Sequence, residues 1–372
     1  MKIINVIQRF NVGGIEKLLL EYLKFFKDKN GIDYRVVVLE KKQDNIFEQQ
    51  AIESGLKITF LNAEESNNKH YYIRKYLRWK RFDKSLYEYL KKERPDIVHL
   101  HNTRLLIKIQ WTLKKLHKKF KWFLTLHSDP FAINKIHVPL AKKAFNEYNI
   151  IPICLNKTQF DKAKKRYEIS SCEYLNNAID FENLKRISKT RKQVRKELGV
   201  SDDCLLIGCV GRVAEVKNYD FFLEVMKEIV KKSKNAFAVI VGDSQGSDRL
   251  KDKLLKLKIE NNVAFIGQRS DVSNIYNSID RFVSTSFTEA SSIASLESQY
   301  FNNYCIVSEA IPEESVVVKD RVIRLSLSES PLKWADQIVC PTLFEKPLQS
   351  ISDYDINNVA QKMISLYKKE RK

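Results

Sequence analysis

The sequence predicts an α/β protein built from two domains, each with a parallel sheet. Short apolar runs typical of strands alternate with amphipathic segments typical of helices along most of the chain. The alternation starts again near residue 205, after a polar and basic stretch at residues 182–199 that suits a linker or an exposed helix. The 372 residues are 44% hydrophobic, which is enough for two cores of this kind. In such sheets, ligands bind beside the carboxyl ends of the strands.

The first half of the chain is expected to alternate between strands and helices. Strands are expected at residues 2–8, 34–39, 57–61, 96–101, 122–127 and 150–155, and helices at 15–27, 47–54, within 69–94 and at 105–121. Gly13 and Gly14 join the first strand to the first helix, where glycine lets backbone N–H groups approach a phosphate or simply makes a tight turn.

The second half repeats the pattern and then ends in a helical tail. Strands are expected at residues 205–210, 236–241, 263–266, 281–283 and 305–307, and helices at 220–232, 248–257, from the stretch 286–297 onward, and within 353–372. The polar segments after these strands are therefore the places to look for a site.

The net charge of +19, from 65 basic and 46 acidic residues, predicts a polyanionic partner: nucleic acid, an anionic bilayer surface or a phosphorylated substrate. Residues 69–94 and 105–121 mix Lys and Arg with aromatic side chains. Solvated helix faces, membrane-surface contact and nucleic-acid binding all fit such segments, and the absence of a recognisable nucleic-acid motif makes the last the least favoured.

No segment resembles a signal peptide or a membrane span, so we expect a soluble protein. The six cysteines are scattered, mostly among apolar residues, and none has the spacing of a zinc site. Buried thiols, a cytoplasmic location and no metal are the corresponding expectations.

The stretch 286–297 contains two carboxylates, Glu289 and Glu297. If both lay on the helix, they would be about 12 Å apart along its axis, which is too far to act together on one proton. They suit a ligand with hydroxyl groups at both ends and an anionic centre, which the N–H groups of a helix N-terminus would bind. A nucleotide sugar is such a ligand.

Two further groups of residues follow predicted strands. Arg212 and Lys217 lie in the loop after residue 210, where a guanidinium and an ammonium group would suit a diphosphate. His101 and His127 end two first-half strands and could donate to sugar hydroxyls, whereas His99 lies inside a strand and is more consistent with a structural role.

With these residues assembled, the chain resembles a GT-B glycosyltransferase of the family 4 type, the retaining, metal-independent class common in capsule and exopolysaccharide synthesis. The resemblance rests on the spacing of Glu289 and Glu297, on Gly211-Arg212 followed by Lys217-Asn218, and on Gly13-Gly14. Three weaker matches accompany it. Asn177-Ala178-Ile179-Asp180 resembles an interdomain motif of the family. Gly242-Asp243 and residues 265–271, with Arg269, resemble the lining of the base pocket.

The resemblance implies two Rossmann-like domains that face an interdomain cleft. It places an acceptor-binding domain at residues 1–168, a nucleotide-sugar-binding domain at 169–352, and a last helix at 353–372 that returns to the first domain. It also implies a donor that is a nucleotide sugar, for which a UDP-sugar is the leading expectation. We assign no separate catalytic base.

The resemblance further implies a role for each candidate residue. Arg212 and Lys217 would hold the donor diphosphate, Glu297 the ribose, and Glu289 the transferred sugar. The remaining donor contacts would come from His127 and Gly14, with Gly13 beside it, from Arg269, and from the N–H groups of Ala290, Ser291 and Ser292. The family usually has Gly and Pro where Ala290 and Ser292 stand, which leaves the identity of the sugar open.

The leading hypothesis is therefore transfer of a hexose from a UDP-sugar to a lipid-linked saccharide of the bacterial surface, by a protein at the inner face of the cell membrane. Two alternatives stay open: a nucleotide-sugar epimerase or phosphorylase-like enzyme of the same fold, and a non-catalytic partner subunit of another transferase. Binding of nucleic acid is not expected.

Overall fold

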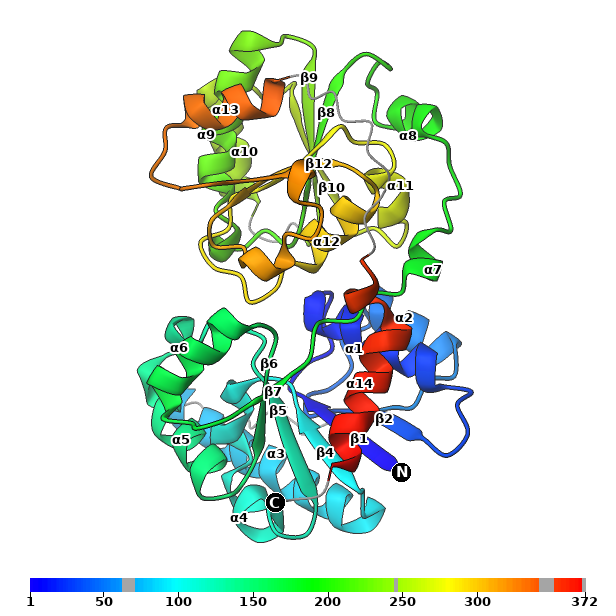
Figure 1. Ribbon diagram of the computed structural model, residues 1–372, viewed down its shortest axis with the longest axis vertical. Coiled ribbons are helices and arrows are strands. Elements are labelled where there is room, and N and C mark those ends of the chain that lie inside the picture. The colour runs from blue at the N-terminus through cyan, green and yellow to red at the C-terminus, as the bar shows by residue number, and fades with distance from the viewer. Residues whose placement is uncertain (62–70, 244–246, 341–350, 370–372) are drawn as a thin grey trace. The chain divides into compact units, whose positions relative to one another are not determined.

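The computed structural model of the chain describes residues 1–61, 71–243, 247–340 and 351–369. The chain divides into two compact units, Met1–Ile179 with Asp353–Lys372, and Asp180–Ser352 (Figure 1). The boundary thus falls 11 residues beyond the predicted 168/169, because strand β7 (Glu173–Tyr174) pairs with strand β6 (Ile151–Cys154) of the first sheet. Residues 69–70 of the predicted basic stretch, 341–350 of the predicted second domain and 370–372 of the predicted tail lie outside the described residues.

The first unit is built on a parallel sheet with the strand order β3-β2-β1-β4-β5-β6-β7. Its other strands are β1 (Lys2–Ile7), β2 (Asp33–Val38), β3 (Ile58–Phe60), β4 (Ile97–Leu100) and β5 (Lys121–Thr125). Its α-helices are α1 (Gly14–Phe26), α2 (Ile46–Glu53), α3 (Tyr71–Glu93), α4 (Gln110–Leu116), α5 (Val138–Asn146), α6 (Lys157–Tyr167) and α14 (Ile356–Lys368). The strand order reverses between β1 and β4, which is where a doubly wound sheet places its ligand site.

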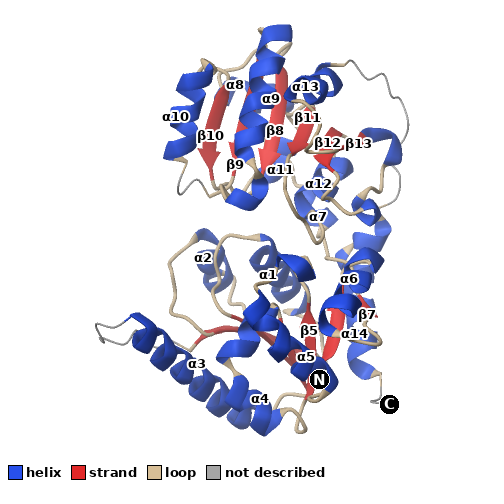
Figure 2. Cartoon of the chain, turned by 90° about the vertical axis from the view of Figure 1, so that its left-hand side faces the viewer, coloured by secondary structure: helices blue, strands red, loops and turns tan. Residues whose placement is uncertain are grey.

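The second unit repeats this arrangement with the strand order β10-β9-β8-β11-β12-β13, again all parallel. Its strands are β8 (Leu205–Val210), β9 (Ala236–Val241), β10 (Val263–Gly267), β11 (Arg281–Ser284), β12 (Tyr304–Ser308) and β13 (Val322–Leu325). Its α-helices are α7 (Phe181–Leu184), α8 (Arg191–Glu197), α9 (Tyr219–Lys232), α10 (Asp248–Leu257), α11 (Val272–Tyr276), α12 (Ile293–Tyr300) and α13 (Pro331–Val339). Helices α9 and α10 cover one face of this sheet (Figure 2). The order reverses between β8 and β11.

The C-terminal helix α14 belongs to the core of the first unit. Its apolar residues Val359, Ala360 and Met363 pack in the same cluster as α1 and strands β1 and β2. Tyr367 at its end lies 2.6 Å from Nδ1 of His99 on β4. Residues separated by most of the chain therefore stabilise one sheet.

The predicted helix at residues 105–121 is wrong as one element. The structure has a 3₁₀ helix at Thr103–Lys108, a break at Ile109, and α4 at Gln110–Leu116. The break is stabilised by Asp83 of α3, whose carboxylate accepts hydrogen bonds from the backbone N–H groups of Trp111 and Thr112. A carboxylate from another helix thus satisfies the first turn of α4.

For residues 182–199, which were expected to be a linker or an exposed helix, the structure has the short helix α8, and this helix packs into the second unit through Val194 and Arg195. Arg195 of α8 is fully buried, and its guanidinium donates to the backbone carbonyls of Ser278, Ser201 and Cys204. A stretch that is polar by composition is thus tied into the core by hydrogen bonds that its sequence does not reveal.

Most of the remaining differences are elements that the sequence analysis did not predict. They are the strands β7 and β13 and the helices α5, α6, α7, α8, α11 and α13. Of the cysteines that were expected to be buried thiols, Cys154, Cys204, Cys209 and Cys305 are buried, whereas Cys172 is half-buried and Cys340 is exposed.

Candidate active site

The strongest candidate site of the second unit lies where the loops after β8 and β11 meet, at the reversal of the strand order. The backbone N–H of Phe287 donates to the carbonyl of Val216 at 2.8 Å, and the Thr285 hydroxyl donates to the carbonyl of Asn218 at 3.0 Å. These bonds hold the loop that carries Arg212 and Lys217 against the loop that carries Glu289.

Lys217 and Glu289 are in direct contact at this place. The Lys217 ammonium donates to Oε1 of Glu289 at 2.6 Å, and the Ser286 hydroxyl donates to the same oxygen at 2.9 Å. An ammonium group has three N–H donors, so two remain for a ligand. The structure therefore places a cation suited to phosphate beside a carboxylate suited to sugar hydroxyls.

The loop with Arg212 is shaped by a close approach between two strand ends. A Cβ atom on Gly242 would lie 2.4 Å from the carbonyl oxygen of Gly211 and 2.9 Å from the backbone nitrogen of Arg212. Gly242 also has φ +147°, which side chains rarely adopt. Only glycine fits at position 242, and the peptide before Arg212 is positioned by it.

Glu289 does not lie on a helix, so the axial separation that was considered for two helical carboxylates does not apply. Helix α12 begins at Ile293, and Ser292 is its N-cap, with its hydroxyl accepting from the N–H of Ser295. The Ser291 hydroxyl is buried without a hydrogen-bond partner in the described part of the chain. Ala290 to Ser292 thus form the loop that leads from Glu289 into the helix.

Glu297 is 2% exposed, near the middle of α12. Burial, and next the charge of Glu297, raise the pKa of the neighbouring Tyr276 well above its usual value. A carboxylate at this depth is costly unless it is hydrogen-bonded. That Glu297 binds the ribose of a donor stays a prediction.

Arg269 lies after β10, farther along the edge where the strands end. Its guanidinium makes two hydrogen bonds to Asp271, at 2.8 and 2.7 Å. This bidentate pair raises the pKa of Arg269 and fixes its orientation. In the predicted contact with a nucleotide base, Arg269 would therefore take part while its guanidinium is paired with Asp271.

In the first unit, Gly13 and Gly14 start helix α1 at the carboxyl end of β1. Gly13 is the N-cap, and no side chain caps this helix. A Cβ atom on Gly13 would lie 2.6 Å from the Glu16 carboxylate, a contact that a shift of that flexible side chain could relieve. That the first backbone N–H groups of α1 bind a phosphate stays a prediction.

The histidines of the first unit form a chain of hydrogen bonds that determines their tautomers. Asn5 donates through Nδ2 to the carbonyl of Arg35, so its Oδ1 accepts from Nε2 of His101 at 2.9 Å. Neutral His101 then accepts at Nδ1, and the donor at 3.0 Å is Nε2 of His127. His127 is therefore left with Nδ1 as an acceptor, which a sugar hydroxyl can use.

Burial lowers the pKa of His127 to about 4, and that of His99 to about 3, while His101 is shifted well below its usual value by burial and then by the other two imidazoles. All three are neutral at pH 7. His99 is bonded to Tyr367 and Thr125, which agrees with a structural role.

These histidines predict a defined acid sensitivity. Between pH 6.5 and 4 the unfolded chain binds protons that the native chain does not, so the free energy of unfolding decreases as the pH falls, by up to about 1.4 kcal/mol per pH unit for each histidine. Urea denaturation at pH 7, 6 and 5 measures this, and His127→Asn should flatten the profile. Parallel profiles for the two proteins would contradict the assignment.

Two residues of this chain of hydrogen bonds, His101 and Asn5, are not among the site residues predicted from the sequence. His101 was considered as a residue at a strand end, and Asn5 is a polar residue inside an otherwise apolar strand. That interruption is the available signal, because a buried amide needs partners. The described geometry gathers Lys217, Glu289 and Ser286 in the second unit, and His101 and His127 in the first.

Residues 190–338 match the family model described as glycosyl transferases group 1. The matched residues lie within the second unit, which is thus similar to that family over most of its length. The match includes the loops with Arg212, Lys217 and Glu289, and also α8.

Curated proteins that are similar to the chain are named as glycosyltransferases. The chain is 28% identical over 164 residues to the "Putative glycosyltransferase EpsF" of Bacillus subtilis, covering 44% of this chain and 43% of the relative. It is 26% identical over 242 residues to an Escherichia coli "UDP-Gal:alpha-D-GlcNAc-diphosphoundecaprenol alpha-1,3-galactosyltransferase", covering 60% of each. The matches thus span about half of the length of these relatives.

Solved structures share the whole fold. The crystal structure of Anabaena HepE in complex with UDP and glucose superposes with a TM-score of 0.77 at 16% identity, covering 98% of this chain and 99% of that one. The lipopolysaccharide glycosyltransferase WaaG gives a TM-score of 0.67 at 13% identity, covering 91% and 94%. The predicted α/β fold of the GT-B type is confirmed.

The described residues contain neither a helix that could span a membrane nor a group of side chains that could hold a metal ion. None of the helices there is long and apolar enough to cross a membrane. No group of three or more His, Cys, Asp and Glu side chains in the described ranges is placed to hold a metal ion. That the reaction needs no metal stays a prediction.

Proposed function

We propose that this protein is a glycosyltransferase of the retaining, family 4 type that transfers a hexose from a UDP-sugar to a lipid-linked saccharide of the bacterial surface. The observation that carries the proposal is the contact between Lys217 and Glu289 at the reversal of the second sheet. It joins a phosphate-binding group and a sugar-binding group at one point, as a nucleotide sugar requires.

In the proposed complex, Arg212 and Lys217 hold the diphosphate and stabilise the negative charge that develops on the leaving nucleotide. Electrostatic stabilisation of this kind is usually the largest catalytic contribution. Glu297 accepts from the ribose, and Glu289 accepts from the sugar, with the N–H groups of Ala290 to Ser292 nearby. We assign no catalytic base.

The contacts proposed for the first unit follow its own geometry. Gly14 and the open first turn of α1 bind phosphate, and Nδ1 of His127 accepts from a sugar hydroxyl. In the second unit, Arg269, fixed by Asp271, lines the place of the base.

The relatives support the choice of donor and acceptor. The E. coli relative is named for a UDP-galactose donor and a diphosphoundecaprenol-linked acceptor, and HepE was crystallised with UDP and glucose. A UDP-sugar and a lipid-linked saccharide are therefore the substrates that we propose here, in a capsular or exopolysaccharide pathway.

A peripheral position at the inner face of the cell membrane fits the surface of the first unit. Helix α3 exposes Ile73 and Tyr76, and α4 exposes Trp111. Lys80 lies over the Tyr76 ring at 4.7 Å. Basic and aromatic side chains that are exposed together suit the interface of an anionic bilayer.

A screen of nucleotide sugars for thermal stabilisation tests the donor. A donor at 100 times its dissociation constant raises the free energy of unfolding by about 2.7 kcal/mol, so one UDP-sugar should raise the melting temperature by several degrees. Glu297→Gln should abolish the increase, whereas Glu309→Gln, a change at an exposed position, should keep it. If no nucleotide sugar stabilises the protein, the proposal is wrong.

A further inference from the structure

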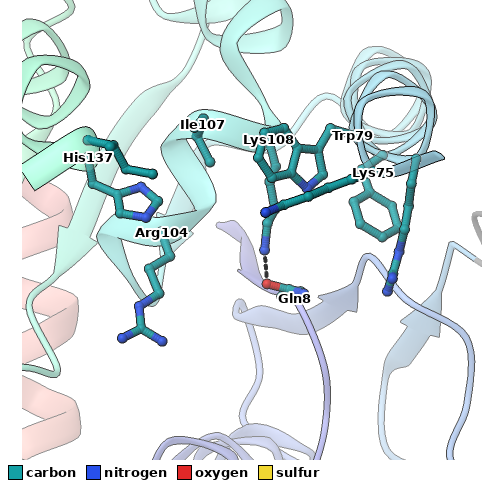
Figure 3. Close-up of a pocket in the computed structure, with 10 residues that line it drawn as sticks. Gln8, Lys75, Trp79, Arg104, Ile107, Lys108 and His137 are labelled. Carbon is teal, nitrogen blue, oxygen red and sulfur yellow. Dashed lines mark hydrogen bonds between the residues drawn. The ribbon is translucent and has the colours of Figure 1, made fainter. Parts of the chain in front are cut away.

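The first unit contains a cavity of about 380 Å³ that the proposed donor contacts do not use (Figure 3). We call it the basic cavity. It lies between α3 and the 3₁₀ segment before α4, and it is lined by Gln8, Lys75, Arg78, Trp79, Phe82, Arg104, Ile107, Lys108, Ile136 and His137. The donor loops with Lys217 and Glu289 belong to the other unit, so this cavity is built from different residues.

The lining carries an excess of positive charge. Four of its side chains are cationic, namely those of Lys75, Arg78, Arg104 and Lys108, and no carboxylate belongs to the lining among the described residues. The acid nearby is Glu40, which pairs with Arg78 at 2.7 Å and also with Arg9. One carboxylate is thus shared by two arginines, and neither Arg104 nor Lys108 forms an ion pair with a carboxylate among the described residues.

Lys108 lies among these cations and is half-buried. Its ammonium donates to the amide oxygen of Gln8 rather than to a carboxylate (Figure 3). Burial lowers its pKa to about 8, the arginines at positions 78, 9 and 104 act in the same direction, and Glu40 opposes them. A bound anion would relieve the repulsion among these cations.

One wall of the basic cavity is apolar. Trp79, Phe82, Ile107 and Ile136 belong to the lining, and Ile136 is 62% exposed. The Lys75 ammonium lies 5.1 Å from the centre of the Trp79 ring. Tyr76, the next residue on α3, is 55% exposed. A ligand that combines an anionic group with an apolar part matches such a lining better than a small free anion does.

We propose that the basic cavity binds the diphosphate of the lipid-linked acceptor, with the apolar wall beside its lipid. Two arginine forks and two ammonium groups suit a group with several phosphate oxygens. The assignment to the acceptor rests on the function proposed above, whereas the presence of an anion site does not.

Titration with inorganic pyrophosphate at fixed, low ionic strength tests the anion site without any transferase activity. The Lys217→Ala variant serves as the background, so that the donor loop does not contribute. In it, Arg104→Gln with Lys108→Gln should weaken pyrophosphate binding at least tenfold, roughly as expected for the loss of two charge-assisted contacts. The matched control is Lys114→Gln with Lys115→Gln, which removes the same charge from exposed positions of α4 and should leave the affinity unchanged.

Because Lys108 is half-buried, Arg104→Gln is also made alone; Arg104 is exposed, and its loss should not unfold the protein. It should weaken pyrophosphate binding in the same direction. Unchanged affinity in both variants, or an equal loss in the lysine control, would rule out the anion site.

Transfer assays with the Arg104→Gln variant in the otherwise native chain then identify the source of the phosphate. The KM for a short-chain alkyl diphosphate glycoside should rise at least tenfold, while the same glycoside without phosphate and the KM for the donor are unaffected. An equal rise in KM for both glycosides would overturn the assignment to the acceptor. The assignment would also be overturned if phosphatidylglycerol vesicles displaced bound pyrophosphate and the diphosphate glycoside did not. An absence of all transfer, with the pyrophosphate results intact, would instead count against the proposed function.

Discussion

Replacing Lys217 with alanine should lower the rate of sugar transfer roughly 10²–10³-fold, the range seen when one preorganised donor to a developing negative charge is removed. The Lys217 ammonium contacts Glu289 at 2.6 Å and has two further N–H donors for the diphosphate. The variant loses the positive charge, and the Ser286 hydroxyl is then the donor that stays at Oε1 of Glu289. Initial rates of UDP release at saturating acceptor measure the effect.

The matched control for Lys217 is Lys231→Ala. Lys231 also forms an ion pair, with Glu228 at 2.7 Å, but on the surface of α9. An exposed pair of this kind contributes little to stability, so we expect full activity and an unchanged melting temperature. Undiminished transfer by the Lys217 variant would rule out its proposed role at the diphosphate.

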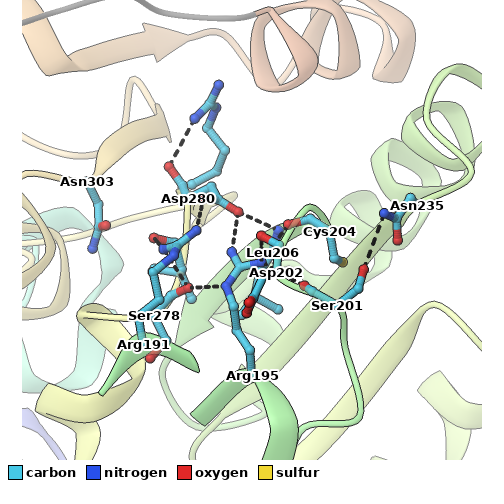
Figure 4. A network of polar contacts seen from close by, with 12 residues as sticks. Arg191, Arg195, Ser201, Asp202, Cys204, Leu206, Asn235, Ser278, Asp280 and Asn303 are labelled. Atoms are coloured by element: carbon cyan, nitrogen blue, oxygen red, sulfur yellow. Dashed lines mark hydrogen bonds and ion pairs between the residues drawn. The ribbon is translucent and has the colours of Figure 1, made fainter. Parts of the chain in front are cut away.

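Replacing Asp280 with alanine should lower the free energy of unfolding of the second unit by about 3–5 kcal/mol, the usual cost of leaving a buried charge without its partner. Arg195 is completely buried and donates to Asp280 at 2.6 Å, and Asp280 also accepts from the backbone N–H of Leu206 at the start of β8 (Figure 4). Arg191 pairs with the other carboxylate oxygen. One aspartate thus joins α8 to the sheet.

Urea denaturation followed by circular dichroism measures the loss. Asp202→Ala is the control, because Asp202 pairs with Lys192 at 3.9 Å through side chains that are 62% and 84% exposed. It should change stability by no more than about 0.5 kcal/mol. Combining Asp280→Ala with Arg195→Met should restore part of the loss, since the unpaired charge is then removed too. If Asp280→Ala is as stable as the control, the network does not hold α8 in place.

The parts of the fold that follow from local pattern were predictable. Apolar runs such as residues 205–210 and 236–241 form strands β8 and β9, because a strand buried on both faces is apolar throughout. The amphipathic tail forms α14, whose apolar stripe includes Val359 and Met363. Periodicity is a property of neighbouring residues, and it survives without knowledge of the tertiary structure.

The predictions that differ from the structure concern segments whose conformation depends on residues far away in the sequence. The helix predicted at residues 105–121 is interrupted, and Asp83, more than twenty residues earlier, caps its second part. The polar stretch 182–199 contains Arg195. This side chain is buried because the carbonyl of Ser278 and the carboxylate of Asp280, more than eighty residues later, accept hydrogen bonds from it. The domain boundary shifts to residue 179 because β7 pairs with β6.

For the candidate site, the sequence by itself determined which residues follow the strands: Arg212 and Lys217 after β8, Glu289 after β11, and His127 after β5. Only the tertiary structure decided that Lys217 touches Glu289, that Glu289 precedes the helix instead of lying on it, and that Asn5 and His101 set the tautomer of His127. The physical reason is the strand order. Parallel strands that are far apart in the chain become neighbours at β8–β11 and β1–β4, and hydrogen bonds between their ends cannot be inferred from local pattern.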